Sequence, residues 1–554
     1  MFGFLKRGKK TADDTLSDIK TVSRWMQDLP TGDIYTAQEQ VVQSLIQFNH
    51  AQMPMSKERL NVLMHLDEHA RDMQFSLCSQ YLRNPRMSKV IESRLWTAIH
   101  AFYWEITRGY HAFLMDFVSD PGGSRIQHAV PQITARALRG FANIFKWRYF
   151  RYEKIEDKLW IRLHNIYRIA EFDSFAGSAL KVYPSDAQIS SCAREYVQAL
   201  LLSPLGSGSL TPRQIDMVDQ WLDNWGDMLS LDRQADADRH AFYVDLAKGA
   251  GLRRLRKDMS GDNTWRYVPM DKLLDHLELV RRSLKSGATP ASVGLGEEFR
   301  LPDGYDLLEY VSNEWSPLTE QDRRRATRHP IQSRWEVVRD LSNITQRMQA
   351  DINLASGQGG TTLSPEEILD IKLYGFVTER TKAIVRQKTI DNLRPEGLER
   401  WPLQDRSETG IGVVLRNDDG DWVRVSKLLS LRPDPGEHWR LGVIRRISRI
   451  DADWRKIGIE FLSEQPRLVH VELMDTAPLA YAVDDSVHLG DESQASPAIL
   501  IPDKDTELLV LESAKYAHGR TLKLHDGDEM RFIKLESVKD KGDGWLMTQY
   551  STVE

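Results

Sequence analysis

Cysteine is almost absent from this chain. Only Cys78 and Cys192 occur among its 554 residues. Two cysteines cannot build the disulfide framework of a small secreted domain, and they exclude a cysteine-rich metal site. The sequence therefore favours a reducing compartment, and we expect a cytoplasmic protein.

Long apolar runs and a positive net charge are also missing. No stretch approaches the roughly 20 apolar residues that a membrane-spanning helix needs, so we expect no transmembrane segment. The start, MFGFLKRGKKTADD, lacks the apolar core and the cleavage site of a signal peptide. The formal net charge is −6 at pH 7, whereas broad binding to nucleic acid needs a basic face. We expect no nucleic-acid polymer as a partner, and a site for a small anion at most.

Catalytic signatures are scarce. The chain has no Walker loop, no Rossmann glycine fingerprint and no nucleophile elbow. The run His65–His69, HLDEH, matches the inverted zinc-peptidase pattern, which places both histidines on one helical face beside a carboxylate. No third ligand can be identified, and short motifs of this kind often arise by chance. We interpret the run as a surface helix and predict no catalysis, no metal and no cofactor.

The length of the chain calls for several domains, because a single hydrophobic core does not extend over 554 residues. A content of 41% hydrophobic and 28% charged residues is typical of globular proteins. The predicted fold class is multidomain α+β. The predicted segments are an all-α bundle or solenoid over 1–230, a mixed α/β connector and linker over 231–317, an antiparallel β-barrel over 318–475 with a helical insertion near 356–400, and a small β-domain over 490–554.

The first segment shows helical periodicity almost throughout, with apolar residues at three- and four-residue intervals. SLTPRQIDMVDQWLDNW opens with Thr211, Pro212 and Gln214, which is the order of a capped helix. Its dense aromatic residues, Trp96, Phe102, Tyr103, Trp104, Trp147, Tyr149 and Phe150, indicate packing between helices.

The connector has its own features. A basic patch of Arg253, Arg254, Arg256 and Lys257 would suit an acidic partner, although a solvated face is the simpler interpretation. The residues of 283–304 are rich in Gly, Ser and Pro, which indicates a linker or an irregular surface segment.

Two short motifs stand out in the second half of the chain. RRRATR, residues 323–328, contains an R-x-x-x-R made of Arg324 and Arg328. DRSETG contains a D-x-S-x-x-G made of Asp405, Ser407 and Gly410, and the strand-like runs IGVVL, WRLGVIRRI and KIGIEFL follow it. Neither motif is specific alone, since a second R-x-x-x-R occurs inside the predicted barrel. The order of the two motifs, together with the strands that follow the second one, is more specific than either motif alone.

Together these motifs resemble the PilZ domain, a bacterial β-barrel receptor for cyclic di-GMP. The resemblance implies that Arg324 and Arg328, with Arg323 and Arg325 beside them, lie on a segment before the barrel and wrap over the nucleotide. It also implies that Asp405, Ser407 and Gly410 lie on the barrel surface. The chemistry agrees, because a guanidinium can grip a phosphate or the O6–N7 edge of guanine. A carboxylate accepts from guanine N–H groups, a hydroxyl adds a contact, and glycine allows a close approach.

The spacing of the motifs departs from the family pattern. Arg328 and Asp405 are 405 − 328 = 77 positions apart, much farther than in ordinary members. RWEVVRDLSNI, residues 334–344, is predicted as the first strand. The insertion then begins a helix with Ser364 as N-cap, Pro365 and Glu367. Three roles suit the insertion: packing on the core, covering the barrel, or forming a homo-oligomer.

The last segment alternates apolar and polar residues between DKD, HDGD and KGDG turns. This pattern predicts a small antiparallel barrel or sheet, packed on the first barrel.

Two functions remain open. In the first, the barrel binds cyclic di-GMP and relays binding to the helical half, which engages an unidentified protein partner. By family analogy the output would be motility, pili or surface attachment in biofilms. In the second, the chain is a non-catalytic scaffold with a degenerate barrel. The GGDEF and EAL signatures of the enzymes that make and degrade cyclic di-GMP are absent.

Overall fold

The chain folds into two compact units, Met1–Gln321 and Asp322–Glu554, which we describe separately. The computed structural model describes residues 16–51, 53–84, 87–122, 124–206, 208–236, 239–256, 259, 261–300, 304–316, 327–355, 378, 381, 398–420, 422–474, 495–503 and 506–553.

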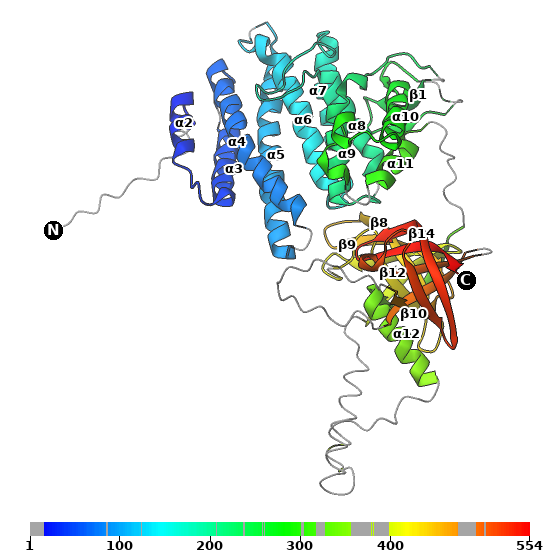
Figure 1. Cartoon of the computed structure of the whole chain (residues 1–554). Helices are drawn as coiled ribbons and strands as arrows, with labels where there is room; N and C mark the ends of the chain where they lie inside the picture. The colour runs from blue at the N-terminus through cyan, green and yellow to red at the C-terminus, as the bar shows by residue number, and fades with distance from the viewer. Residues whose placement is uncertain are drawn as a thin grey trace, which may run out of the picture. The chain divides into compact units, whose positions relative to one another are not determined.

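The first unit is largely helical, as predicted, and its helices stand side by side in a row from α2 to α11 (Figure 1). Their buried side chains form one continuous core. The predicted cap at Thr211 is confirmed, since its hydroxyl accepts from the backbone N–H of Gln214 and the Gln214 side chain accepts in return. The α-helices of this unit are α2 (Ile19–Gln27), α3 (Ile34–His50), α4 (Lys57–Arg83), α5 (Lys89–Ser119), α6 (Val130–Tyr149), α7 (Asp157–Phe172), α8 (Cys192–Leu205), α9 (Pro212–Asn224), α10 (Asp271–Lys285) and α11 (Gly304–Trp315).

A small antiparallel sheet interrupts the helices, in the order β2 (Arg253–Arg254), β1 (His240–Asp245), β3 (Trp265–Pro269). The short strands and the following α10 agree with the mixed α/β connector predicted over 231–317. The segment that we expected to be a linker is irregular, but Leu295 and Phe299 within it are buried in the helical core.

The basic patch is also less solvated than we expected. The guanidinium of Arg254 donates to the carbonyls of Glu314 and Ser316 at the end of α11. Arg253 and Arg256 are exposed, and Lys257 lies outside the described residues.

One side of the HLDEH run belongs to the core, which corrects our interpretation of it as a surface helix in part, since Leu66 and Asp67 are buried while His69 is exposed. Asp67 is 2% exposed and accepts a hydrogen bond from Tyr110 at 2.7 Å. Arg136, also buried, pairs with Glu68 at 2.5 Å. The two acids of the run therefore serve an internal ion cluster that joins α4 to α5 and α6. Within the described residues, no group of three or more His, Cys, Asp or Glu side chains could hold a metal.

The second unit contains two closed antiparallel barrels, which confirms the predicted fold class. The first barrel has the strand order β4-β5-β6-β9-β8-β7. Its strands are β4 (His329–Arg339), β5 (Leu398–Ser407), β6 (Gly410–Arg416), β7 (Leu428–Arg432), β8 (Arg440–Arg449) and β9 (Trp454–Ser463).

The first strand begins and ends five residues earlier than the predicted 334–344. β4 ends at Arg339, Asp340 takes a left-handed backbone conformation with φ of 64°, and α12 (Leu341–Ala355) begins at once. The predicted helix start at Ser364, and nearly all of the insertion over 356–400, lies outside the described residues.

The second barrel has the strand order β10-β11-β12-β15-β14-β13. The segment predicted for the first barrel extended to residue 475, but its last strand, β10, belongs to the second barrel and pairs with β11 and β13. The strands are β10 (Arg467–Leu473), β11 (Ser496–Asp503), β12 (Thr506–Glu512), β13 (Thr521–Asp526), β14 (Glu529–Gly542) and β15 (Trp545–Val553).

The two barrels and α12 share one hydrophobic cluster, which we call the seam. It includes Ile344 and Met348 of α12, Val443 of β8, and Ile499 and Trp545 of the second barrel. The packing of a second barrel on the first was predicted from the alternating pattern. No helix in the described part of the chain is long and apolar enough to cross a membrane.

Candidate ligand site on the first barrel

The candidate site lies where β4, β5 and β6 meet. Asp405 of β5 stands opposite Pro330 of β4 and opposite Gly412 of β6. Two residues later, Ser407 pairs with Gly410 across a tight turn, and the Ser407 hydroxyl donates to the Gly410 carbonyl at 3.2 Å. The D-x-S-x-x-G motif is therefore the end of one strand, a turn and the start of the next.

Asp405 holds two cations at once. Its Oδ1 accepts from Arg328 Nη1 at 2.9 Å, and its Oδ2 accepts from Lys456 Nζ at 2.8 Å. The carboxylate is 15% exposed, while Arg328 and Lys456 are 53% and 37% exposed. Such charge-assisted bonds are stronger than neutral ones, so they hold the carboxylate in one orientation while both cations still face solvent. We call these three residues the Asp405 cluster.

A strip with two glycines crosses the sheet beside this cluster, and Gly412 within it is buried next to the Asp405 carboxylate. Asp405 pairs with Gly412, Gly412 with Gly458 of β9, and Gly458 with Arg446 of β8. Side chains directly opposite one another in a sheet lie on the same face. Val413, the neighbour of Gly412, is fully buried inside the barrel, so Gly412 belongs to the outer face. The strip spans three strand spacings, about 14 Å, with an acid at one end and an arginine at the other.

Gly410 of the motif, and Gly412 two residues after it, are fixed by close contacts rather than by turn geometry. A Cβ on Gly410 would collide with the backbone carbonyl of Ile459. A Cβ on Gly412 would lie 2.5 Å from Asp405 Oδ1. A side chain at Gly412 would therefore push away the carboxylate that organises the cluster.

The structure places the predicted site residues unequally. Arg328 and Asp405 are in direct contact, and Ser407 and Gly410 form the adjacent turn. Arg323, Arg324 and Arg325 lie outside the described residues.

Lys456 was missed, although its position offered a signal. It lies two residues before Gly458 in the KIGIEFL run, on the strand next to the motif strand. The second R-x-x-x-R has a different role, because Arg445 pairs with Glu460 at 2.7 Å and with Asp540 of the second barrel.

The comparison with known families concerns the other unit. Residues 20–236 match the family model described as "Cyclic-di-GMP receptor FimW, N-terminal domain". No curated protein matches the chain. The match covers the helical region from α2 to η2 (Gly226–Met228), which the sequence motifs left unrecognised, and does not extend to the barrels. The helical part of this chain is therefore similar to the N-terminal domain of a cyclic-di-GMP receptor.

Proposed function

We propose that this protein is a cyclic di-GMP receptor whose first barrel binds the dinucleotide at the Asp405 cluster. The observation that carries the proposal is the contact between Arg328 and Asp405, two motif residues that are 77 positions apart in the chain. The family match in the helical unit supports a receptor independently, because it does not involve either motif.

The chemistry of the cluster suits this ligand. Two cations and one carboxylate leave a net charge of +1, and the run Arg323 to Arg325 precedes the cluster by only a few residues. A cyclic dinucleotide presents two phosphates and two guanines. Arg328 can turn from Asp405 to a phosphate or to the O6–N7 edge of guanine. Lys456 remains as the counter-charge of Asp405, and the freed Oδ1 can accept from guanine N–H groups.

The proposed output is a relay of dinucleotide binding from the first barrel to the helical unit. The segment that carries the arginine run joins the two units, so folding of this segment over a bound dinucleotide would change the link between them. The helical unit would then engage its protein partner differently. Control of motility, pili or surface attachment is the output that the resemblance to the PilZ domain implies.

One observation favours a second candidate, the scaffold. Both oxygens of Asp405 already have cationic partners, so the cluster is satisfied without a ligand and could serve only to tie β4 to β5 and β9. In that case the barrel is a structural module with no nucleotide site.

Isothermal titration of the full chain with cyclic di-GMP separates the two candidates. The receptor requires binding by the wild-type chain. Arg328→Ala should weaken binding by a few kcal/mol, as expected when a charge-assisted contact is lost. Arg416→Ala is the matched control, since Arg416 is an exposed arginine at the end of β6, away from the cluster. Absence of binding by the wild-type chain would support the scaffold, and equal losses in both variants would show that the dinucleotide does not bind at the Asp405 cluster.

A further inference from the structure

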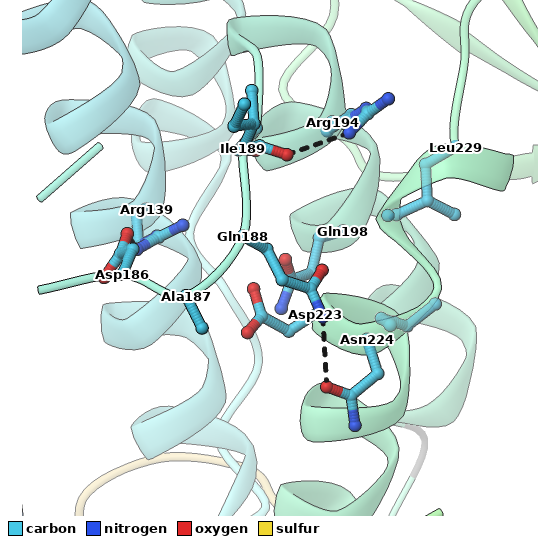
Figure 2. A pocket seen from close by; sticks show the side chains of 13 residues that line it. Arg139, Asp186, Ala187, Gln188, Ile189, Arg194, Gln198, Asp223, Asn224 and Leu229 are labelled. Atoms are coloured by element: carbon cyan, nitrogen blue, oxygen red, sulfur yellow. Dashed lines mark hydrogen bonds and ion pairs between the residues drawn. The ribbon is translucent and has the colours of Figure 1, made fainter. Parts of the chain in front are cut away.

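Arg139 of the helical unit illustrates a largely buried arginine with a complete set of partners. It lies beside a cavity of about 140 Å³ between the loop before α8 and the end of α9 (Figure 2). Its guanidinium donates to both carboxylate oxygens of Glu195, at 2.8 and 2.7 Å, and to Asp186 at 2.5 Å. All three guanidinium nitrogens are engaged, although the side chain is 20% exposed.

Arg440 of the first barrel is buried to the same degree but lacks such partners. Its side chain is 19% exposed, and its Nη1 is buried without a hydrogen-bond partner in the described part of the chain. The other buried arginine nitrogens without a partner among the described residues are inner Nε atoms. A buried donor left unsatisfied is costly, so it calls for an explanation.

Arg406 faces the interior at the same end of the barrel. It follows Asp405 in β5, and successive side chains of a strand point to opposite faces. Arg406 pairs with Ile411, which is 2% exposed, whereas Asp405 pairs with Gly412 on the outer face. The barrel pairings place the end of β5 beside the starts of β4, β6 and β8, and Arg440 is the first residue of β8. We call this end of the barrel the mouth.

Two aromatic rings lie beside the arginines of the mouth. The guanidinium carbons of Arg406 and Arg440 are 5.6 and 4.8 Å from the ring centre of Trp335. Phe461 is stacked with Trp335 at 6.5 Å between ring centres and is partly exposed. Ser333 precedes Trp335 by two positions in β4, so both side chains lie on one face. The Ser333 hydroxyl is also buried without a partner in the described structure, so the mouth holds two unused polar groups.

One acid stands between the two arginines and satisfies neither. Glu464 Oε1 is 3.6 Å from Arg406 Nη2 and 3.6 Å from Arg440 Nε, which is too long for a hydrogen bond in both cases. The Glu464 side chain is 55% exposed. Burial, followed by the charge of Arg406, lowers the pKa of Arg440, and the attraction of Glu464 and Glu437 does not offset this. The pair therefore carries positive charge that a stronger anion would neutralise.

Phosphate has the chemistry that Glu464 lacks. A carboxylate offers two oxygens and one charge, whereas a phosphate monoester or orthophosphate at neutral pH offers three or four oxygens and nearly two charges. A guanidinium can donate two parallel N–H bonds to a phosphate, so one phosphate can engage two arginines at once. The exposed Glu464 can turn into solvent when the anion arrives.

We propose that the mouth of the first barrel binds a phosphate group between Arg406 and Arg440, in the place that Glu464 Oε1 occupies. This site lies on the inner face of β5, and the Asp405 cluster lies on its outer face. The proposal therefore does not depend on what the Asp405 cluster binds.

The first test uses inorganic phosphate and guanosine 5′-monophosphate as probes of the full chain. Line broadening in ³¹P NMR should give a Kd on the order of 1 mM for phosphate. Equal affinity of the two probes would mean that the mouth recognises the phosphate alone. An affinity for the nucleotide about tenfold higher would add a stacked base to the site. Absence of binding by both probes would overturn the proposal.

The second test changes the arginine pair. Arg440→Gln should weaken phosphate binding about tenfold or more, because a charge-assisted contact is lost. Arg416→Gln is the matched control, since Arg416 is exposed at the end of β6, at the opposite end of the barrel. Arg328→Ala should leave phosphate binding unchanged. Equal losses in Arg440→Gln and either of these two variants would contradict the assignment.

The third test removes the competing acid and does not disturb a buried group. Glu464→Gln should tighten phosphate binding about two- to fivefold, because the exposed carboxylate no longer competes for the two guanidiniums. A merely structural role of the cluster predicts no gain in affinity. Unchanged or weaker phosphate binding in Glu464→Gln would sink the proposal, even if Arg440→Gln failed to fold.

Discussion

Gly412 is the residue on which the geometry of the Asp405 cluster depends most directly. Its missing side chain leaves the space that the Asp405 carboxylate occupies, and this contact orients both carboxylate oxygens toward their cations. Gly458, its partner across the strand pair, is less crowded, since an added Cβ there would lie 3.5 Å from Arg446 Cβ. The two glycines therefore offer a matched pair of substitutions.

Gly412→Ala should displace Asp405 and weaken cyclic di-GMP binding at least about tenfold, with little change in the fold of the barrel. Gly458→Ala tests the strip itself, because its methyl group meets only an ordinary contact distance. If the dinucleotide lies flat on the strip, both variants lose affinity in a titration. If binding depends only on the Asp405 carboxylate, Gly412→Ala loses affinity and Gly458→Ala does not. Unchanged affinity in Gly412→Ala would remove the cluster from the binding site.

His100 is a second residue with a measurable consequence. It is stacked between Trp96 and Trp104, and its Nε2 is buried without a hydrogen-bond partner in the described structure. Burial, with a smaller effect of Arg148 and Arg151, lowers the pKa of His100 to about 4. In the unfolded chain the same ring titrates near 6.5.

Stability of the helical unit should therefore fall as the pH drops from about 6.5 toward 4. In this range the unfolded chain binds a proton at His100 that the folded chain refuses, and the loss can reach a few kcal/mol. His100→Phe keeps an aromatic ring between the indoles and should reduce this dependence, measured as melting temperature against pH. A residual slope is expected from His164, because burial also lowers its pKa to about 4. An unchanged slope in the variant would contradict the assignment.

At the scale of elements, local signals were read correctly where they are self-contained. The capping box at Thr211 and the strand that follows the D-x-S-x-x-G motif are examples, because each needs only neighbouring residues. The end of β4 was not predicted, since the turn depends on the left-handed backbone of Asp340 and on Leu341, Ile344 and Met348 packing into the seam. Strand β10 has the same alternation as the strands before it, so the sequence could not assign it to the second barrel.

Helix α12 should contribute to stability through one face only. Ile344 is 1% exposed in the seam, while Ile352 on the same helix is 49% exposed. Ile344→Ala should lower the free energy of unfolding by about 2–5 kcal/mol, as is typical of buried aliphatic truncations. Ile352→Ala is the control and should change it by about 0.5 kcal/mol or less. Chemical denaturation measures both, and similar losses would mean that α12 does not pack as described.

At the scale of the whole molecule, the two barrels are coupled by the seam and by charges at its edge. Trp545 is 1% exposed and donates from its indole N–H to the Ser426 carbonyl at 3.0 Å. Lys427 bridges Asp340, before α12, and Asp543 of the second barrel, at 2.6 and 3.1 Å. The barrels of the second unit should therefore unfold together.

Trp545→Ala should destabilise both barrels by about 3–5 kcal/mol, because it removes a large side chain from their common cluster. Hydrogen exchange of β5 in the first barrel and of β12 in the second should accelerate together. Trp454→Ala is the control, since Trp454 is 42% exposed at the start of β9. Faster exchange in the second barrel alone would show that the barrels unfold independently.

At the candidate site, the sequence predicted one long-range contact and missed another. Motif order predicted that Arg328 and Asp405 belong together despite the intervening chain, and they are in contact. Lys456 comes from β9, which pairs with β6 from a distant part of the chain, so the spacing within the motifs did not reveal it.

The seam also has a consequence for how this protein can change over generations. A gene rearrangement that deleted the C-terminal barrel would expose the apolar side chains of Val443, Ile344 and their neighbours. An exposed apolar patch of this kind promotes aggregation. Where side chains of the two barrels interdigitate, a substitution in one barrel requires a compensating substitution in the other. We therefore expect relatives to inherit the two barrels as a pair, even where the nucleotide motifs themselves have decayed.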